Sequence, residues 1–305
     1  SDAETSSVIT GFVDGPGGLV DVPRTYVYAE IDVPVTGARR QEHPERAQVL
    51  GSITIDVSTA RTATLAVGVS HISIEQARRN LQHDTTAAAH GFDEVHAVTR
   101  ASWNELLGRL EVTGATGEQL TTIYSNLYRL YLYPNIGHEN AGTATDPIWC
   151  YADPFVSGMQ DLPTHTGREV VASTLTVTDG FWDSYRASWP LRTLITPGAT
   201  AHLLNGFIEH FRQGGWTSRW SAPGPADIMT GTSSDAVLAD AVLAGVPGID
   251  VLDAYDSCLR NATTPSDDPH VGRKGLARSI FRGFTDTDTF EGMSWTVDAA
   301  INDAA

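Results

Sequence analysis

The sequence predicts an α+β chain: the C-terminal part of a β-sandwich, then a helical linker, then half of an (α/α)6 toroid. Residues 1–75 have the apolar alternation of strands, and residues 76–116 change to a helical period. Residues 117–305 read as helices joined by alternating long and short connections. These three ranges are the expected domains.

The strand region depends on two stretches. Residues 25–33 (TYVYAEIDV) are rich in β-branched and aromatic residues. Residues 51–57 alternate between apolar and polar side chains, and the polar break at 58–61 predicts a hairpin into a second strand at 65–69. Because about four strands are few for a stable sandwich, we expect the end of a larger β-domain.

The linker has an amphipathic helical pattern. Trp103, Leu106, Leu107 and Leu110 follow the spacing i, i+3, i+4, i+7, which predicts one buried helical face.

The remaining chain shows a regular rhythm of helices and connections. The first two helices are expected at 118–133 and 180–195. A third follows Thr196-Pro197 and ends at Gly214-Gly215, and the last three are expected at 233–245, at 249–261 and from 293 onward. The long connections 134–178, 214–232 and 262–292 precede the second, fourth and sixth of these helices. Long connections are uncommon unless they serve a function. If the helices alternate between an outer and an inner ring, these loops and the inner N-termini share one face.

Those inner N-termini carry polar and aromatic residues. The second helix begins Gly180-Phe181-Trp182-Asp183, the fourth begins with Ser233, Ser234 and Asp235, and Glu291 precedes the sixth. Helix N-termini offer unpaired donors and partial positive charge, which favour carboxylates. Asp183 and Asp235 therefore either face a ligand or serve as caps with Trp182 in the core, and both interpretations stay open.

The long loops add aromatic and charged side chains to the same face. These are Trp149, Tyr151, Trp216, Arg219, Trp220 and Asp227. Such a mixture suits a sugar, whose apolar faces stack on aromatic rings while its hydroxyls need polar partners. Tryptophans that anchor the loops' own packing are an equally good explanation.

Composition excludes several classes of function. The formal net charge of −17 repels a phosphate backbone, so no nucleic-acid partner is expected. No apolar run is long enough to span a membrane, and the polar start at residues 1–5 shows no signal peptide. Cys150 and Cys258 allow at most one disulfide and form no zinc pattern. Asp286 and Asp288 lack the glycine of a calcium loop.

Several ordered stretches resemble glycoside hydrolase family 92. They are 91–112 (GFDEVHAVTRASWNELLGRLEV), 127–137 (LYRLYLYPNIG), 179–197 (DGFWDSYRASWPLRTLITP), 205–224 (NGFIEHFRQGGWTSRWSAPG) and 228–241 (IMTGTSSDAVLADA). The resemblance implies a calcium-dependent, inverting exo-α-mannosidase with a β-sandwich, linker helices and an (α/α)6 barrel. Inverting enzymes use one carboxyl group as acid and another as base.

The resemblance also implies site residues. Trp182 and Asp183 match the family's segment that contacts the terminal sugar. The full expected substrate-binding set is Trp182, Asp183, Arg186, Arg219, Trp220, Asp227, Ser234 and Asp235. The family's acid, base and calcium ligands are expected downstream of residue 305, so this chain alone is expected to be inactive.

The expected partners are mannose-containing glycans, including mannosyl phosphodiesters, and the missing C-terminal half of the barrel. Lys274 is the only lysine, which indicates a GC-rich genome, and we expect a secreted or cell-surface bacterial protein. The alternative is a non-catalytic mannose-binding or structural barrel. Two cleft carboxylates beyond residue 305 would indicate the hydrolase, and their absence would indicate the non-catalytic barrel.

Overall fold

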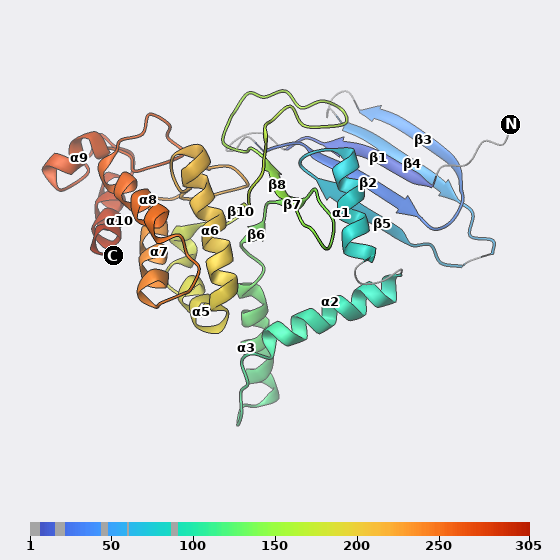
Figure 1. Cartoon of the computed structure of the whole chain (residues 1–305), viewed down its shortest axis with the longest axis horizontal. Helices are drawn as coiled ribbons and strands as arrows, with labels where there is room; N and C mark the ends of the chain where they lie inside the picture. The colour runs from blue at the N-terminus through green and yellow to red at the C-terminus, as the bar shows by residue number, and fades with distance from the viewer. Residues whose placement is uncertain (1–6, 16–21, 44–47, 60, 87–90) are drawn as a thin grey trace.

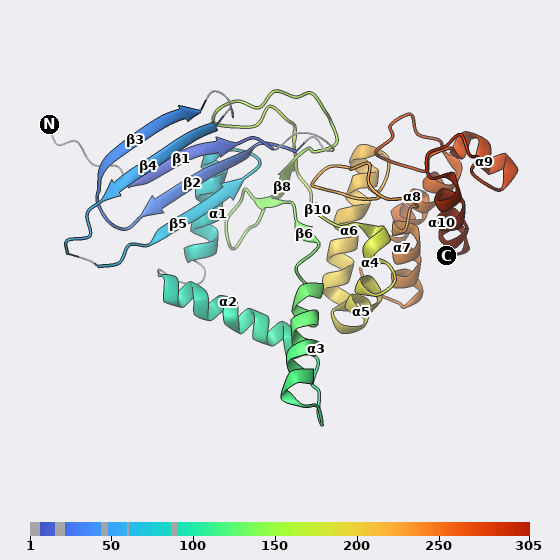
Figure 2. The same cartoon turned by 180° about the vertical axis from the view of Figure 1, so that it is seen from behind.

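The computed structural model describes residues 7–15, 22–43, 48–59, 61–86 and 91–305. The polar start of the chain and Ala60, in the expected hairpin turn, lie outside the described residues. The longer strands lie at one end of the molecule and most helices lie at the other (Figures 1 and 2). A segment of loops and very short strands connects the two.

The strand region contains two separate antiparallel groups. One sheet has the order β1–β2–β5, made by Val8–Val13, Thr25–Ile31 and Leu65–Ser70. The second pairs β3 (Val35–His43) with β4 (Gln48–Ile55).

The expected hairpin between residues 51–57 and 65–69 is therefore wrong. β5 pairs with β2 instead of β4. Asp32, directly after β2, aligns the incoming chain: Thr64 N–H donates to Asp32 Oδ1 at 2.7 Å, and Asp32 N–H donates to Thr64 O at 3.2 Å. Alternation identifies a strand and its faces, whereas contacts such as these select its neighbour.

Helix α1 (Ile74–Thr86) packs on the β2–β5 part of the sheet. Ser73 starts it, because its hydroxyl accepts the N–H of Gln76 at 2.9 Å. Gly68 lets α1 approach closely, since a Cβ there would collide with Ala77 O and lie 2.8 Å from the Cβ of Leu81.

Helices α2 (Phe92–Leu107) and α3 (Gly117–Leu130) follow as a separate pair. The predicted apolar face is only half-buried, and no residue of α2 is fully buried. Its main aromatic contact is Trp103 against Tyr128, with ring centroids 4.6 Å apart. Thr116 and Gln119 form a reciprocal capping box at the start of α3.

The helical layer consists of α4 (Phe181–Ser184), α5 (Ser188–Ile195), α6 (Pro197–Gly214), α7 (Ser234–Leu243), α8 (Val251–Thr263), α9 (Leu276–Arg282) and α10 (Gly292–Ala304). α5, α7 and α10 contact one another in sequence as one row, while α6, α8 and α9 form a second row beside it. The main core lies between the rows and includes Phe181, Trp189, Leu204, Phe207 and Leu238.

Two expected boundaries in this layer are wrong. The helix predicted over 180–195 is broken at residues 185–187 into α4 and α5. Pro190 explains the break, because its ring has no N–H for an uninterrupted helix, whereas the first turn of a new helix accommodates proline. The connection 262–292 contains α9, which is flanked by Gly275 and Gly283, both with positive φ.

The long connection 134–178 joins the sheet to the helices. It contains β6 (Asn135–Ile136), β7 (Glu139–Asn140), β8 (Trp149–Ala152), β9 (Val170–Val171) and β10 (Thr176–Val177). On the sheet side, the N–H of Arg24 donates to Asp161 Oδ2 at 3.1 Å. On the helix side, His210 Nε2 lies 2.7 Å from Thr176 O, near the C-terminal end of α6. No helix within the described residues is long and apolar enough to cross a membrane.

Candidate functional site

The start of α4 presents an exposed carboxylate beside an exposed indole. Trp182 is 38% exposed, and Asp183 next to it is exposed as well. The indole N–H of Trp220, from the loop after α6, donates to Asp183 Oδ2 at 3.1 Å. The other oxygen, Asp183 Oδ1, has no hydrogen-bond partner in the described part of the chain. This geometry orients the carboxylate and leaves one oxygen free to accept from a ligand.

Arg186 lies on the same exposed surface. Its Nε donates to the hydroxyl of Tyr185 at 2.7 Å. Its guanidinium lies 5.0 Å from the ring centre of Tyr185 and 6.0 Å from that of Trp182. The structure thus brings together four predicted residues, Trp182, Asp183, Arg186 and Trp220, which we call the α4 cluster.

Arg219 has a buried, structural environment. It is 2% exposed, and its guanidinium donates to Gly272 O at 2.8 Å and to Pro269 O at 2.9 Å. It also pairs with Asp227 at 2.8 Å. Burial lowers the pKa of Arg219, an effect that the charge of Asp227 opposes. Lys274, which sequence reasoning did not select, makes a second ion pair with Asp227 at 2.7 Å.

Ser234 and Asp235 are buried at the start of α7. The carboxylate of Asp235 accepts from Thr232 Oγ1 at 2.6 Å and from Asn261 Nδ2 at 2.8 Å, and it pairs with Arg273 at 3.2 Å. In this arrangement Asp235 joins α7, α8 and the loop before α9. Asn261 is 0% exposed, so this first residue of the sequence Asn261-Ala262-Thr263, formally a glycosylation sequon, is enclosed in the fold.

Asp235 makes folding stability depend on pH in a defined direction. Burial raises the pKa of Asp235 to about 6, although its hydrogen bonds and Arg273 lower it. The folded state therefore holds this proton more tightly than the unfolded state, and the contribution of Asp235 to stability falls as pH rises from about 4 to about 6. Across that window the loss is roughly 3 kcal/mol.

The variant Asp235→Asn removes this titration. As pH rises from 4 to 7, we expect the Tm of Asp235→Asn to increase relative to the Tm of the parent chain, because only the parent chain loses the contribution of the protonated Asp235. Thermal unfolding followed by circular dichroism at several pH values measures it. A Tm difference that is constant over this range would contradict the assignment.

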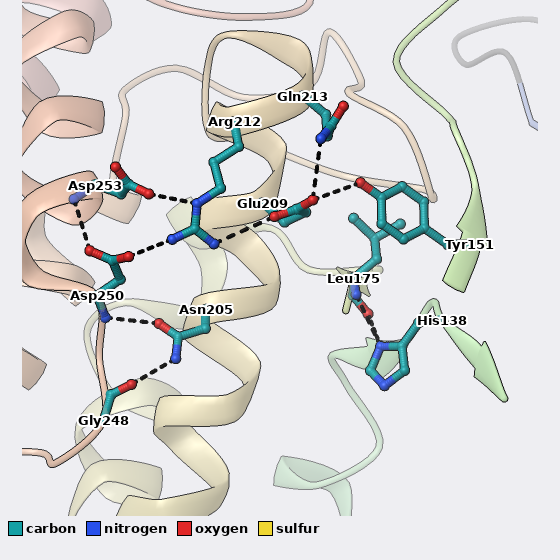
Figure 3. Close-up of polar contacts among 10 residues, drawn as sticks. All are labelled: His138, Tyr151, Leu175, Asn205, Glu209, Arg212, Gln213, Gly248, Asp250 and Asp253. Carbon is teal, nitrogen blue, oxygen red and sulfur yellow. Dashed lines mark hydrogen bonds and ion pairs between the residues drawn. The ribbon is translucent and has the colours of Figure 1, made fainter. Parts of the chain in front are cut away.

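Two of the loop aromatics expected on the same face, Tyr151 and Trp216, make packing and polar contacts within the fold. Tyr151 is buried and donates its hydroxyl to Glu209 Oε1 at 3.1 Å (Figure 3). Figure 3 also shows Arg212 on the same helix, α6, pairing with Asp250 at 2.6 Å and Asp253 at 2.5 Å. This network connects β8 through α6 to the start of α8.

The second of these aromatics, Trp216, lies under the guanidinium of Arg260, whose central carbon is 4.0 Å from the indole ring centre. Trp149 contacts the ring of His138. The explanation that loop aromatics anchor their own packing therefore holds for Tyr151 and Trp216, whereas Trp182 stays exposed.

Unusual backbone conformations occur near the starts of three helices. Within the described residues, the non-glycine positions with positive φ are Thr178, Met229 and Glu291. Thr178 precedes α4, Met229 precedes α7 and Glu291 directly precedes α10. Left-handed conformations are costly for such residues and cluster at functional sites. All three lie close to the N-termini of the row that sequence analysis placed around a cleft.

Acidic, histidine and cysteine side chains do not gather into a metal-binding group within the described residues. That part of the chain contains no group of three or more such side chains arranged to hold an ion. The Asp286 carboxylate is paired with Arg278 and Arg282 instead. The calcium ion implied by the family resemblance thus finds no such group of side chains within the described residues. Cys150 and Cys258 are both free thiols.

Sequence reasoning missed Asp179, two residues after β10. It is 7% exposed, and its Oδ2 accepts from Ser184 Oγ and from Trp189 Nε1, both at 2.9 Å. Burial raises the pKa of Asp179, an effect that these two hydrogen bonds oppose. The sequence signal is a carboxylate just before a Gly-aromatic helix start, but its partners become evident only from the fold.

The fold is shared with known enzymes. A family GH92 inverting mannosidase from Bacteroides thetaiotaomicron superposes with a TM-score of 0.83 at 24% identity, over 99% of this chain and 40% of that one. A GH92 alpha-mannosidase from the same bacterium, solved with mannoimidazole, gives 0.78 at 21% identity, over 98% and 39%. This chain thus spans about two fifths of the length of these proteins. No curated protein sequence matches it.

Sequence similarity adds the family itself. The model of the glycosyl hydrolase family 92 catalytic domain matches residues 76–305, from within α1 to the end of α10. The matched region contains the whole α4 cluster and both rows of helices. Because it covers most of the chain, the protein belongs to glycosyl hydrolase family 92.

Proposed function

We propose that this chain is part of an inverting exo-α-mannosidase and that the α4 cluster binds the terminal mannose. The observation that carries the proposal is the exposed Asp183 carboxylate, held through one oxygen by the Trp220 indole and free at the other. Family membership and the likeness to an inverting mannosidase from Bacteroides thetaiotaomicron support the reaction. The two rows of helices support half of an (α/α)6 barrel, and the two strand groups support part of a β-sandwich.

The chemistry of the cluster suits a sugar ring. Asp183 accepts hydrogen bonds from hydroxyl groups, and a charged acceptor makes them stronger than neutral ones. The exposed face of Trp182 covers the apolar C–H side of the ring. Arg186 adds a donor at the edge. The cluster thus binds and orients the sugar, while we propose that the acid and base belong to the remainder of the enzyme.

Arg219, Ser234 and Asp235 are buried and then act behind the cluster. Arg219 fixes the loop that carries Trp220, and Asp235 fixes the start of α7. Asp227 is partly exposed, and we still propose it as a direct sugar contact. We further propose, from the resemblance, that the enzyme needs calcium, acts on glycans or mannosyl phosphodiesters and is secreted or displayed by a bacterium.

Product analysis tests this function. We expect the longer enzyme to release mannose from a terminal α-mannoside, with the β-anomer formed first, because an inverting reaction displaces the leaving group by water from the opposite face. Proton NMR during the first minutes distinguishes the anomers. We expect the 305-residue chain alone to release none, with or without added calcium.

Two results would contradict the proposal. An initial α-anomer would exclude inversion. Binding of mannose by the longer protein without any release would favour the non-catalytic carbohydrate-binding barrel.

A further inference from the structure

Asp179 joins three elements behind the α4 cluster. Its carboxylate accepts from Ser184, the last residue of α4, and from Trp189 in α5. A single oxygen, Oδ2, receives both donors, and Asp179 itself lies two residues after β10. The break between α4 and α5 is therefore spanned by a buried carboxylate, which holds the short helix in a defined orientation.

The backbone around Asp179 also holds the loop that carries Trp220. Ser221 N–H donates to Asp179 O at 3.0 Å, and Phe181 N–H donates to Arg219 O at 3.2 Å. Residues 180 and 220 form an antiparallel bridge between these two bonds. Trp182, Asp183 and Trp220 are thus presented by two backbone segments that are hydrogen-bonded to each other at this turn.

Gly180 provides the space in which the Trp220 indole lies. The φ of Gly180 is −109°, which any residue can adopt. Glycine is therefore needed at this position only because it has no side chain. A Cβ at this position would collide with the indole nitrogen of Trp220 and lie 2.6 Å from Asp183 Oδ2. A side chain at residue 180 would therefore displace the indole from the carboxylate that it orients.

We propose that Asp179 and Gly180 are the positioning residues of the α4 cluster: Asp179 orients α4, and Gly180 admits the Trp220 indole against Asp183. Neither residue touches the sugar. The proposal rests on the proposed function only for the identity of the ligand, because the positioning itself is a property of this chain.

NMR of the 305-residue chain tests the positioning directly. Its seven tryptophans give seven indole N–H signals, and Trp220→Phe identifies the one from Trp220. In Gly180→Ala we expect that signal to move upfield and its hydrogen exchange to accelerate about tenfold, as for loss of one hydrogen bond. The matched control is Gly198→Ala in the first turn of α6, where a Cβ meets nothing within 4 Å and the signal stays unchanged.

Variants of Asp179 test the second half of the proposal. Asp179→Ala removes the acceptor and should shift both the Trp189 and the Trp220 signals. Asp179→Asn keeps an acceptor oxygen and should restore the Trp220 signal. If Asp179→Ala lowers the Tm but leaves the Trp220 signal in place, its role is structural only. If Asp179→Ala does not fold, the asparagine variant and Gly180→Ala still decide the proposal, and an unchanged Trp220 signal in Gly180→Ala overturns it.

A titration with methyl α-mannoside separates this proposal from the proposed function. We expect the sugar to shift the Trp220 signal of the parent chain and of Gly198→Ala, and to shift that of Gly180→Ala only at about tenfold higher concentration. If the sugar does not shift the Trp220 signal of the parent chain, sugar binding by this chain is contradicted. The change of the Trp220 signal in Gly180→Ala without ligand would still support the positioning proposal.

Discussion

Replacing Asp183 with alanine should lower the kcat/KM of the mannosidase that we propose contains this chain by about two orders of magnitude or more. Each charge-assisted hydrogen bond to a sugar hydroxyl contributes roughly 1.5–3 kcal/mol, and a tenfold change in rate corresponds to about 1.4 kcal/mol. Because Asp183 is exposed, its loss should leave the Tm nearly unchanged. Steady-state kinetics on an aryl α-mannoside, with thermal unfolding in parallel, measures both effects.

Two further variants make this result specific. Asp183→Asn keeps one acceptor oxygen, so its kcat/KM should lie between that of the parent enzyme and that of Asp183→Ala. Asp240→Ala removes an exposed carboxylate elsewhere in the helical layer, on α7, and should change neither quantity. If Asp183 only stabilised the helix start, Asp183→Ala would lower the Tm with kcat/KM unchanged. The geometry already favours a ligand role, because its carboxylate accepts from the Trp220 side chain and caps no α4 backbone N–H.

Among the variants described, Arg219→Ala should lower the stability of the 305-residue chain most. It removes a buried guanidinium that donates to two loop carbonyl groups and pairs with Asp227. It also removes the cation that lies 5.0 Å from the ring centre of Trp295. Breaking a buried pair from one side costs about 3–5 kcal/mol, and the lower end applies because Asp227 is partly solvated. We expect the Tm of the 305-residue chain to fall by roughly 5 °C.

An exposed arginine provides the matched control. Arg278 pairs with Asp286 at 3.2 Å while its side chain is 62% exposed. Surface pairs of this kind contribute about 1 kcal/mol or less, so Arg278→Ala should change the Tm little. Equal effects of the two variants would show that the Arg219 network does not hold the Trp220 loop.

The sequence predicted the elements of this fold better than their partners. Alternation identified the strand at 65–69, but its pairing with β2 depends on Asp32, which lies more than thirty residues away. Helical periodicity also extended across residues 185–187, where Pro190 interrupts the hydrogen bonding. In both places a local pattern was correct and a tertiary or backbone constraint determined the outcome.

The candidate site divides in the same way. Asp183 and Asp235 are both carboxylates in the first turn of a helix, and the sequence did not distinguish them. The structure does, because Asn261 and Arg273 enclose Asp235, whereas Asp183 meets solvent beside Trp182. Asp179 escaped prediction because its donors, Ser184 and Trp189, converge on it only after the α4–α5 break has formed.

A crystal structure of the proposed longer enzyme with mannoimidazole bound is the most direct test of the central claim, that the α4 cluster holds the terminal sugar. We predict a ring hydroxyl within hydrogen-bonding distance of Asp183, about 2.5–3.0 Å, with Trp182 in contact with the ring and Trp220 still on the carboxylate. A bound inhibitor that leaves Asp183 and Trp182 in contact only with water would contradict it.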